Sequence, residues 1–378
     1  MRLRRAMDFG FSPEQRELQS QVRRFLDAEC PLERVRQIMS SSDAHDAGLW
    51  GKMAELGWTA LVVPEAYDGL GLAWEDLVIV AEEMGRSLCP SPYLAAVAAS
   101  RAIAEIASEA QKKRWLPSVA RGTSIPVLAV HDRADLLGED GVTMEVEQVG
   151  ESLALTGTKP FVGYAQAADL LIVAARERCG VSLFAVPADA AGVTITPHKL
   201  VDATYRSASV TFEAVTVDPA DRLGEPGLVW SDLSTTLDAA AIALSAEMVG
   251  AAAAAIMMSV EYAKVREQFG QPIGRFQGVK HRLAELHVGM ESSRSLAYYA
   301  AWAVDNTTEN LAVDASRAKA FASRALDEAG EDCIQIHGGI GYTWECDAQL
   351  YYKRGRYCRN LMGSPEYHYE RLLAVQGV

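Results

Sequence analysis

The stretch from Leu237 to Met258 constrains the fold most, because it is almost entirely apolar and long enough to form a single helix. Such a segment either crosses a membrane or lies in the core of a helical bundle. Alanine dominates it, and it carries Asp238 and Glu247. Membrane spans are richer in leucine and isoleucine and poorer in charge, so we expect a buried helix of an all-α bundle and no membrane span.

Hydrophobic periodicity changes twice along the chain. Ser12-Pro13-Glu14-Gln15 is typical of a helix start, and the apolar residues Leu18, Val22 and Leu26 then recur at helical spacing. From about residue 125 to 223, short runs of Val, Ile and Thr such as Leu170–Ala174 alternate with turn residues, as in a β domain. From Trp230 onward the helical pattern returns.

These changes predict an α+β fold in three parts. We expect an N-terminal helical domain at 1–124, a central β domain at 125–226 and a C-terminal four-helix-bundle domain at 227–378. The central sheet is expected to be antiparallel, because no long helical pattern separates its strands.

Composition excludes several classes of partner. The chain has 378 residues, of which 49% are apolar, so a large core is possible. The net charge of −14 argues against nucleic acid and anionic membrane surfaces. It still allows a negatively charged coenzyme A ester, since one local basic pocket is enough to bind it.

The cysteines and the N-terminus indicate a cytoplasmic protein. The six cysteines lie far apart without any CxxC pair, which favours neither a disulfide framework nor a metal site. The opening Met1–Arg5 is basic but no apolar run follows, so we expect no signal peptide, and Met7 is an alternative start.

A first chemical motif spans Tyr262 to Gln277. A helix should end near Phe269-Gly270, because Pro272 cannot continue it. The next helix should begin at Phe276-Gln277. A guanidinium at such an end, here that of Arg266, can contact a phosphate through two hydrogen bonds. On spacing alone, an ordinary helix–turn–helix with a surface arginine is the favoured interpretation.

A second motif spans Gln335 to Trp344 and reads Gln-Ile-His-Gly-Gly-Ile-Gly-Tyr-Thr-Trp. Three glycines in four positions allow a backbone to approach a ligand closely. The spacing fits neither a Rossmann fingerprint nor a Walker loop. A simple bend between two helices is an equally good interpretation.

Together the two motifs are more specific than either alone. The pairing of 266–277 with 335–342 resembles the C-terminal helical domain of acyl-CoA dehydrogenases. In the β domain, 157–161 and 168–169 are similar to that family's Gly-x-Lys-x-Trp and Ala-Asp segments, and the start at 11–18 is typical of it. With the matching order of domains, the resemblance covers nearly the whole chain.

The resemblance implies FAD bound across a subunit interface, in enzymes that are usually dimers of dimers. A Glu of these enzymes removes the α-proton of an acyl-CoA, and the β-hydrogen passes to the flavin as hydride. The positions of this chain that would contact the ADP half of an FAD are Arg266, Gln268, Phe269, Gln277, Gln335, Gly338, Gly339 and Gly341.

The chain departs from the family at both known positions of the catalytic Glu. The position near the C-terminus holds Met362, and the position on the long helix holds Ala240. Ala241 stands where an Arg often follows. None of these side chains can accept a proton.

The β domain also departs from the family. The zone 128–135 lacks the Thr-Glu-Pro and Gly-Ser-Asp segments that hold the flavin and the substrate carbonyl. Phe161 replaces the usual Trp, and Gly163 falls where a hydroxyl residue is common. The half of the cofactor site that would bind the chain's own flavin ring is therefore eroded.

An intact ADP half beside an eroded flavin half resembles the degenerate subunit of bacterial α2β2 acyl-CoA dehydrogenases, of the type that shortens steroid side chains. We therefore expect a subunit of an FAD-dependent acyl-CoA dehydrogenase, active in lipid and steroid catabolism together with a second family subunit. Alternatives are a homo-oligomeric dehydrogenase that uses Glu247 as a relocated base, or a flavin monooxygenase on the same fold. His131 and His337 are expected to be structural.

Overall fold

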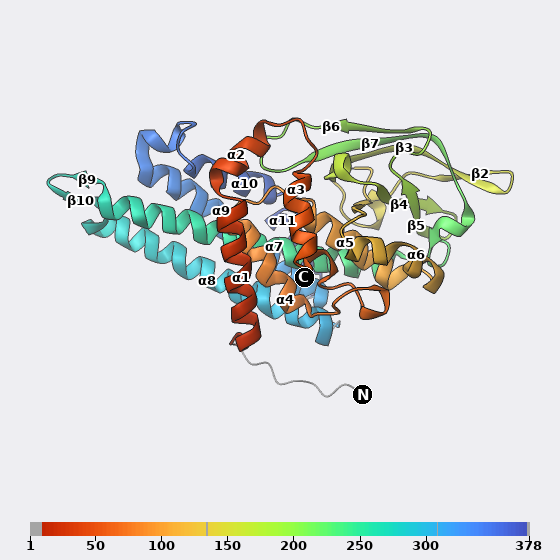
Figure 1. Ribbon diagram of the computed structural model, residues 1–378, viewed down its shortest axis with the longest axis horizontal. Helices are drawn as coiled ribbons and strands as arrows, with labels where there is room; N and C mark the ends of the chain where they lie inside the picture. The colour runs from red at the N-terminus through yellow and green to blue at the C-terminus, as the bar shows by residue number, and fades with distance from the viewer. Residues whose placement is uncertain (1–9, 134, 308, 376–378) are drawn as a thin grey trace. The chain divides into compact units, whose positions relative to one another are not determined.

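The computed structural model describes residues 10–133, 135–307 and 309–375. The predicted alternative start Met7, the basic opening and residue 134 of the zone 128–135 lie outside the described residues. The elements before the sheets are α1 (Pro13–Glu29), α2 (Leu32–Ser40), α3 (Ala47–Glu55), α4 (Trp74–Arg86), α5 (Tyr93–Ile106) and α6 (Glu109–Ala120) (Figure 1).

The middle of the chain forms two four-stranded sheets, in the orders β1-β4-β5-β8 and β2-β3-β7-β6. Their strands are β1 (Pro126–Ala129), β2 (Val146–Val149), β3 (Ser152–Gly163), β4 (Leu170–Glu177), β5 (Gly180–Pro187), β6 (Val193–Pro197), β7 (Ser207–Val217) and β8 (Arg222–Leu223). The strand pairs are antiparallel as predicted, except that β1 and β4 run parallel. The long connection through β2 and β3 makes this parallel pair possible.

Helices return in the last part of the chain. They are α7 (Trp230–Val265), α8 (Gln277–Asn306), α9 (Leu311–His337), α10 (Ala348–Cys358) and α11 (Pro365–Val375). The short strands β9 (Glu267–Gln268) and β10 (Gln271–Pro272) form a hairpin between α7 and α8 (Figure 1). The predicted fold class is confirmed: a largely antiparallel β part lies between two helical parts of the chain. The exact domain limits 1–124, 125–226 and 227–378 stay a prediction.

The described chain packs into two compact units. The helical unit comprises the described residues of 1–37, 73–89 and 241–378, and the mixed unit comprises 38–72 and 90–240. In the mixed unit, strand residues such as Ile172 and Leu183 form a core with Ile103 of α5 and Leu233 of α7. In the helical unit, α9 packs against α8, α10 and α11.

The predicted start of the first helix is confirmed in atomic detail. The Ser12 hydroxyl accepts a hydrogen bond from the Gln15 amide at 3.1 Å, and the Gln15 side chain accepts one from the Ser12 amide at 3.1 Å. This reciprocal pair is a capping box, which satisfies two amide donors that a helix start leaves open. Val22 and Leu26 are buried, as their spacing predicts.

The apolar stretch 237–258 lies inside α7, which has 36 residues. Among the described residues, α7 is the single helix whose length and composition would allow it to cross a membrane. Its most apolar window is 78% buried inside the structure, as in the core helix of a folded protein. Ala251, Ala252 and Ala255 are fully buried, so these small side chains serve close packing.

Helices α4 and α7 touch backbone to backbone in the helical unit. A Cβ atom on Gly85 would lie 1.8 Å from the Glu247 carbonyl oxygen, and one on Gly250 would lie 1.8 Å from the Glu82 carbonyl oxygen. Neither position can hold a side chain without moving a helix. The contact brings the buried carboxylates of α4 into the core, where Glu83 pairs with Arg23 at 2.6 Å and Glu82 with Arg294 at 2.9 Å.

We predict that Gly85→Ala and Gly250→Ala each lower the stability of the protein by about 3 kcal/mol or more, because the added methyl group meets rigid backbone. Thermal or denaturant unfolding measures the loss. Gly289→Ala is the matched control, since Gly289 is also helical and a Cβ there has nothing within 4 Å. Equal stability of the Gly85 variant and this control would contradict the helix contact.

Candidate functional site

The hairpin after α7 presents the first motif to solvent. Phe269 and Gly270 form its two-residue turn with φ values of 53° and 77°, so both lie in the left-handed region. Two positive φ values are typical of a type I′ hairpin turn, in which a phenylalanine is unfavourable. The Phe269 side chain is nevertheless 91% exposed. An exposed aromatic ring on a strained backbone suggests a binding role, since it adds little to the core.

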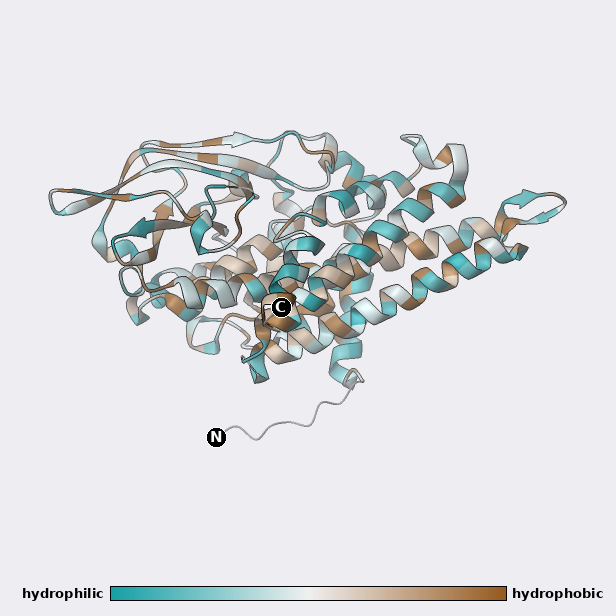
Figure 2. Ribbon diagram, turned by 180° about the vertical axis from the view of Figure 1, so that it is seen from behind, coloured by the Kyte–Doolittle hydropathy of each residue, from teal (hydrophilic) through white to brown (hydrophobic). Residues whose placement is uncertain are grey.

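Arg266 leads into this hairpin and is available to an anion. Its side chain is exposed, and within the described residues its guanidinium forms no ion pair. The Arg266 carbonyl oxygen accepts a hydrogen bond from the Ile273 amide at 2.8 Å, which closes the base of the hairpin. Gln268 and Gln277 are also exposed. Figure 2 shows the hairpin strands in the hydrophilic colour.

The second motif follows the end of α9. Gly338 caps this helix with a φ of 65°, and η7 (Gly338–Tyr342) continues from it. Gln335, Gly338 and Gly339 are exposed, and a Cβ on either glycine would meet nothing within 4 Å. The backbone here is therefore open to a ligand.

Gly341 differs from the other predicted contacts because it is buried. A Cβ at this position would lie 2.7 Å from the Ile334 carbonyl oxygen. Packing explains the glycine at 341, and its contact with a cofactor stays a prediction.

The structure brings the two motifs together in the helical unit. The rings of Tyr262, on the last turns of α7, and His337, the last residue of α9, stack with centroids 4.3 Å apart. Arg266 follows Tyr262 by one helical turn, and Gly338 follows His337 directly. Seven of the eight predicted contacts are therefore exposed, on segments joined by the stack of the half-buried Tyr262 on the buried His337.

The turn between α10 and α11 holds Met362 where the family places a Glu. Met362 has a φ of 57° and Gly363 a φ of 105°. From α9, the Lys319 ammonium donates to the carbonyl oxygens of Cys358 and Gly363, at 3.0 Å each. His368 lies 3.0 Å from the Met362 carbonyl oxygen through Nε2. The turn is thus fixed on both sides of Met362.

Both side chains that fix this turn are buried and have altered pKa values. Burial lowers the pKa of Lys319 to about 8. Burial, reinforced by the nearby Lys319 charge, lowers the pKa of His368 to about 3, so the imidazole is neutral. Because Nε2 faces a carbonyl oxygen, it carries the proton, and Nδ1 accepts from Ser316 at 3.2 Å. Both ring nitrogens of His368 are thus engaged, so this imidazole is not placed to accept a substrate proton.

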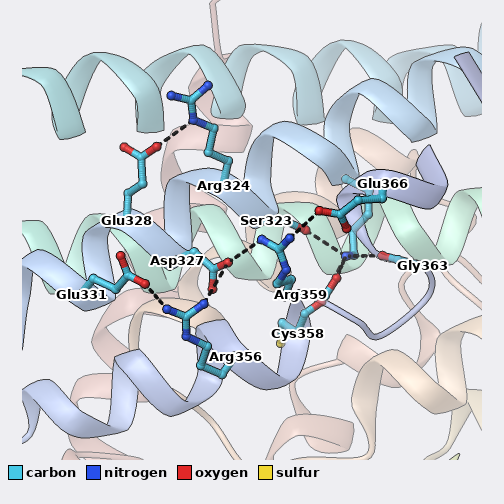
Figure 3. Close-up of polar contacts among 11 residues, drawn as sticks. Ser323, Arg324, Asp327, Glu328, Glu331, Arg356, Cys358, Arg359, Gly363 and Glu366 are labelled. Atoms are coloured by element: carbon cyan, nitrogen blue, oxygen red, sulfur yellow. Dashed lines mark hydrogen bonds and ion pairs between the residues drawn. The ribbon is translucent and has the colours of Figure 1, made fainter. Parts of the chain in front are cut away.

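Ion pairs tie the same three helices together (Figure 3). Arg359, which follows α10, donates to Asp327 of α9 at 3.0 Å and pairs with Glu366 of α11 at 2.6 Å. Arg356 of α10 pairs with Glu331 of α9. Exposed pairs contribute little singly, but this network holds the ends of α9, α10 and α11 in one arrangement.

Glu247, the candidate base, lies in the helical unit against Arg354 of α10. Their side chains form an ion pair, and Arg354 is 1% exposed. A carboxylate that is held by a buried guanidinium is stabilised in its charged form, which makes it a poor acceptor for a substrate proton. This environment suits a structural role better than that of a general base.

In the mixed unit, Lys159 of the Gly-x-Lys segment has a structural partner. Its ammonium lies 2.8 Å from the Asp132 carboxylate and donates to the Val130 carbonyl oxygen at 2.8 Å. Burial lowers the pKa of Lys159 to about 8, although Asp132 acts in the opposite direction. Asp132 also accepts from the amides of Thr143 and Met144. Val130 and Asp132 of the eroded zone are therefore held in place by these contacts.

Two other positions of the mixed unit that differ from the family pattern, Phe161 and Gly163, pack against neighbouring side chains. Phe161 has a φ of 53° in a bulge of β3, and its ring lies 4.9 Å from that of His198. A Cβ on Gly163 would lie 3.0 Å from the Tyr205 hydroxyl oxygen, so a hydroxyl from another residue occupies this place. His131 contacts the Leu137 carbonyl oxygen at 2.8 Å, which supports its expected structural role.

The fold has helical ends and a β middle, and both motifs lie on its helical unit. Residues 12–123 match the model of the acyl-CoA dehydrogenase N-terminal domain, and residues 230–376 match that of the C-terminal domain. The acyl-CoA dehydrogenase IpdE2 of Mycolicibacterium smegmatis is 31% identical over 364 residues, which are 96% of this chain and 99% of that protein. The chain belongs to the acyl-CoA dehydrogenase family.

Two solved structures of complexes are similar to the chain over nearly its whole length. The ChsE4-ChsE5 complex from Mycobacterium tuberculosis matches with a TM-score of 0.89 and 28% identity, covering 98% of this chain and 99% of that one. A variant of the Tcur3481-Tcur3483 steroid ACAD matches with a TM-score of 0.86 and 29% identity, covering 96% and 98%.

FAD is the cofactor of this family, and the exposed residues of the helical unit fit part of it. Arg266 has an exposed guanidinium for a diphosphate, Phe269 offers a ring for stacking, and the glycine backbone at 338–339 is open. Among the described residues, no group of three or more His, Cys, Asp or Glu could hold a metal ion.

We predict that Lys319 makes stability depend on pH. Its pKa is lowered from 10.5 to about 8 in the folded chain, so between these values the unfolded chain binds a proton that the folded chain has lost. Stability therefore rises with pH across this window, by at most about 1.4 kcal/mol per unit of pKa shift. Denaturant unfolding at several pH values measures the slope.

The Lys319→Met variant should lose this rise, whereas Lys113→Met, at an exposed lysine, should keep it. The same pH slope in the wild type and the Lys319 variant would show that Lys319 does not titrate in this range.

Proposed function

We propose that this chain is a subunit of an FAD-dependent acyl-CoA dehydrogenase, and that it supplies the ADP-binding half of the FAD site to a second, catalytic family subunit. The substrate is an acyl-CoA thioester with a steroid-derived acyl group. The complex is an α2β2 heterotetramer. The observation that carries the proposal is the exposed hairpin tip, where Phe269 is 91% exposed close to the exposed Arg266.

The roles of the chain's residues follow from their chemistry. Arg266 binds the diphosphate through its guanidinium, and Phe269 offers its ring to the adenine. The open backbone at Gly338 and Gly339 approaches the nucleotide without a clash, and Gln268, Gln277 and Gln335 are placed to donate or accept hydrogen bonds. Bound FAD supplies the hydride acceptor.

The proposal of a catalytic partner rests on the missing base. Met362 lies on a turn whose neighbouring polar groups, Lys319 and His368, are committed to carbonyl oxygens. Ala240 is buried on α7 and has no ionisable group. Glu247 is held by Arg354. The positions considered, all within the described residues, thus offer no ready acceptor for the α-proton.

The steroid assignment and the heteromeric assembly draw on the comparisons. One similar structure is described as a steroid ACAD, and another as a complex of two chains. The buried alanines of α7 add no argument for a bulky substrate, because their packing is complete.

The first test is the visible spectrum of the chain purified alone and with co-expressed family subunits. We expect little flavin in the single chain and a yellow complex with the right partner. In that complex, Arg266→Ala should weaken FAD binding about tenfold or more, because a charge-assisted hydrogen bond is lost. Arg178→Ala, at an exposed arginine of the mixed unit, is the matched control. A purified homomer with full FAD and acyl-CoA turnover would overturn the proposal.

A separate prediction concerns Glu247. In the active complex, Glu247→Gln should lower thermal stability, because it removes the carboxylate that forms an ion pair with the buried Arg354, at a cost of about 3 kcal/mol or more. It should leave kcat of the folded complex within about threefold of the wild type. The double variant Glu247→Leu/Arg354→Met should regain stability, since it removes both charges. If turnover falls about a hundredfold or more while flavin content is kept, Glu247 is the base.

A further inference from the structure

The end of α9 carries a buried imidazole between two exposed segments. His337 is the last residue of this helix and is 8% exposed, although Gly338 and Gly339, which follow it, are exposed. Its ring lies on the half-buried ring of Tyr262, with centroids 4.3 Å apart and planes inclined by 26°. This near-parallel arrangement is an offset aromatic stack of the kind that proteins favour.

A hydrogen bond fixes the direction of the imidazole. Nδ1 lies 2.7 Å from the Cys333 carbonyl oxygen, one helical turn earlier. Because a carbonyl can only accept, Nδ1 carries the proton. The Cys333 sulfur lies 3.8 Å from the same nitrogen and is fully buried. The ring plane is thus set from within α9, and its face is left for Tyr262.

Tyr262 connects the stack to the hairpin. Its carbonyl oxygen accepts a hydrogen bond from the Arg266 amide at 2.9 Å, in the last turn of the helical backbone. A shift of the Tyr262 ring would therefore move the start of the hairpin that bears Arg266 and Phe269. Likewise, a shift of His337 would move the next residue, Gly338. The φ of Gly338 is 65°, a left-handed conformation that favours glycine.

Helix α9 is held to its other neighbours by contacts that do not involve the stack. Arg282 of α8 pairs with Asp332 at 2.6 Å and with Glu328 at 3.2 Å, both on α9. Helix α9 also packs along α8 and α10. An aromatic pair contributes only about 0.5–1.5 kcal/mol beyond its burial, so its loss should alter local geometry more than global stability.

We propose that His337 is a positioning residue, which uses its stack on Tyr262 to hold the glycine segment 338–339 at a fixed distance from the Arg266 hairpin. Both segments can then contact one nucleotide at once. The inference rests on the proposed role of this chain in binding the ADP half of FAD. It adds a side chain that touches no cofactor but sets the spacing of those that do.

The test separates the ring from the hydrogen bond of His337. His337→Phe keeps an aromatic face but loses the Nδ1 donor, whereas His337→Gln keeps a donor and loses the ring. Tyr262→Leu removes the other half of the stack. Tyr299→Leu is the matched control, because Tyr299 forms an aromatic contact with Trp302 within α8, with centroids 5.9 Å apart. The dissociation constant of FAD for the apo complex is measured by flavin fluorescence, together with the melting temperature.

We expect His337→Gln and Tyr262→Leu each to weaken FAD binding by about three- to tenfold. The double variant should be no weaker than either single variant, since both break one contact. His337→Phe should stay within about twofold of the wild type, and Tyr299→Leu should have no effect. A merely structural role would lower the melting temperature and leave the dissociation constant of the folded complex unchanged.

The Arg266→Ala variant distinguishes failure of this inference from failure of the proposed function. If Arg266→Ala leaves FAD binding unchanged, this chain does not bind the diphosphate and both ideas fall. If Arg266→Ala weakens binding while His337→Gln and Tyr262→Leu do not, only the positioning role is overturned. Additive losses from His337→Gln and Tyr262→Leu would also overturn it, because the two rings would then act separately.

Discussion

The contact of α4 with α7 is the constraint on which the helical unit depends. Gly85 and Gly250 let each helix backbone approach the other to a distance that excludes a methyl group. This approach draws the carboxylates of Glu82 and Glu83 out of water, and burial raises the pKa of Glu82. Such groups are tolerable only when paired, which explains the arginines that converge on them from α1 and α8. Close packing also explains the many alanines of α7, such as the fully buried Ala251, Ala252 and Ala255.

Local signals in the sequence predicted the local structure well. The helix start at Ser12 and the buried helix at 237–258 depend on neighbours in the sequence, and both were predicted correctly, although the return bond from Gln15 that completes the capping box was not predicted. The parallel pairing of β1 with β4 was not predicted. Alternation of apolar and polar residues along a strand does not reveal the direction of the strand beside it. Lys159 and Lys319 were also missed as structural residues, since an isolated lysine in a sequence is normally a surface residue.

For the candidate site, glycine and arginine patterns identified segments but could not show their surroundings. The exposure of Phe269 and the openness around Gly338 agree with a binding surface, while Gly341 is explained by packing against α9. Glu247 illustrates the main difficulty. Its partner Arg354 lies 107 residues away in the sequence, and a pairing over such a distance is set by tertiary packing alone. Only the structure could therefore show that Glu247 forms an ion pair, which argues against its role as a catalytic base.

The turn at Met362 has an implication for how the family diversifies. Lys319 and His368 hold its carbonyl oxygens from neighbouring helices, so its backbone shape does not depend on the side chain at 362. A scaffold of this kind separates the shape of a reaction centre from its chemistry. One codon change could remove or restore a carboxylate without refolding the turn. The contacts that set this turn are thus made by its backbone and not by the side chain at position 362.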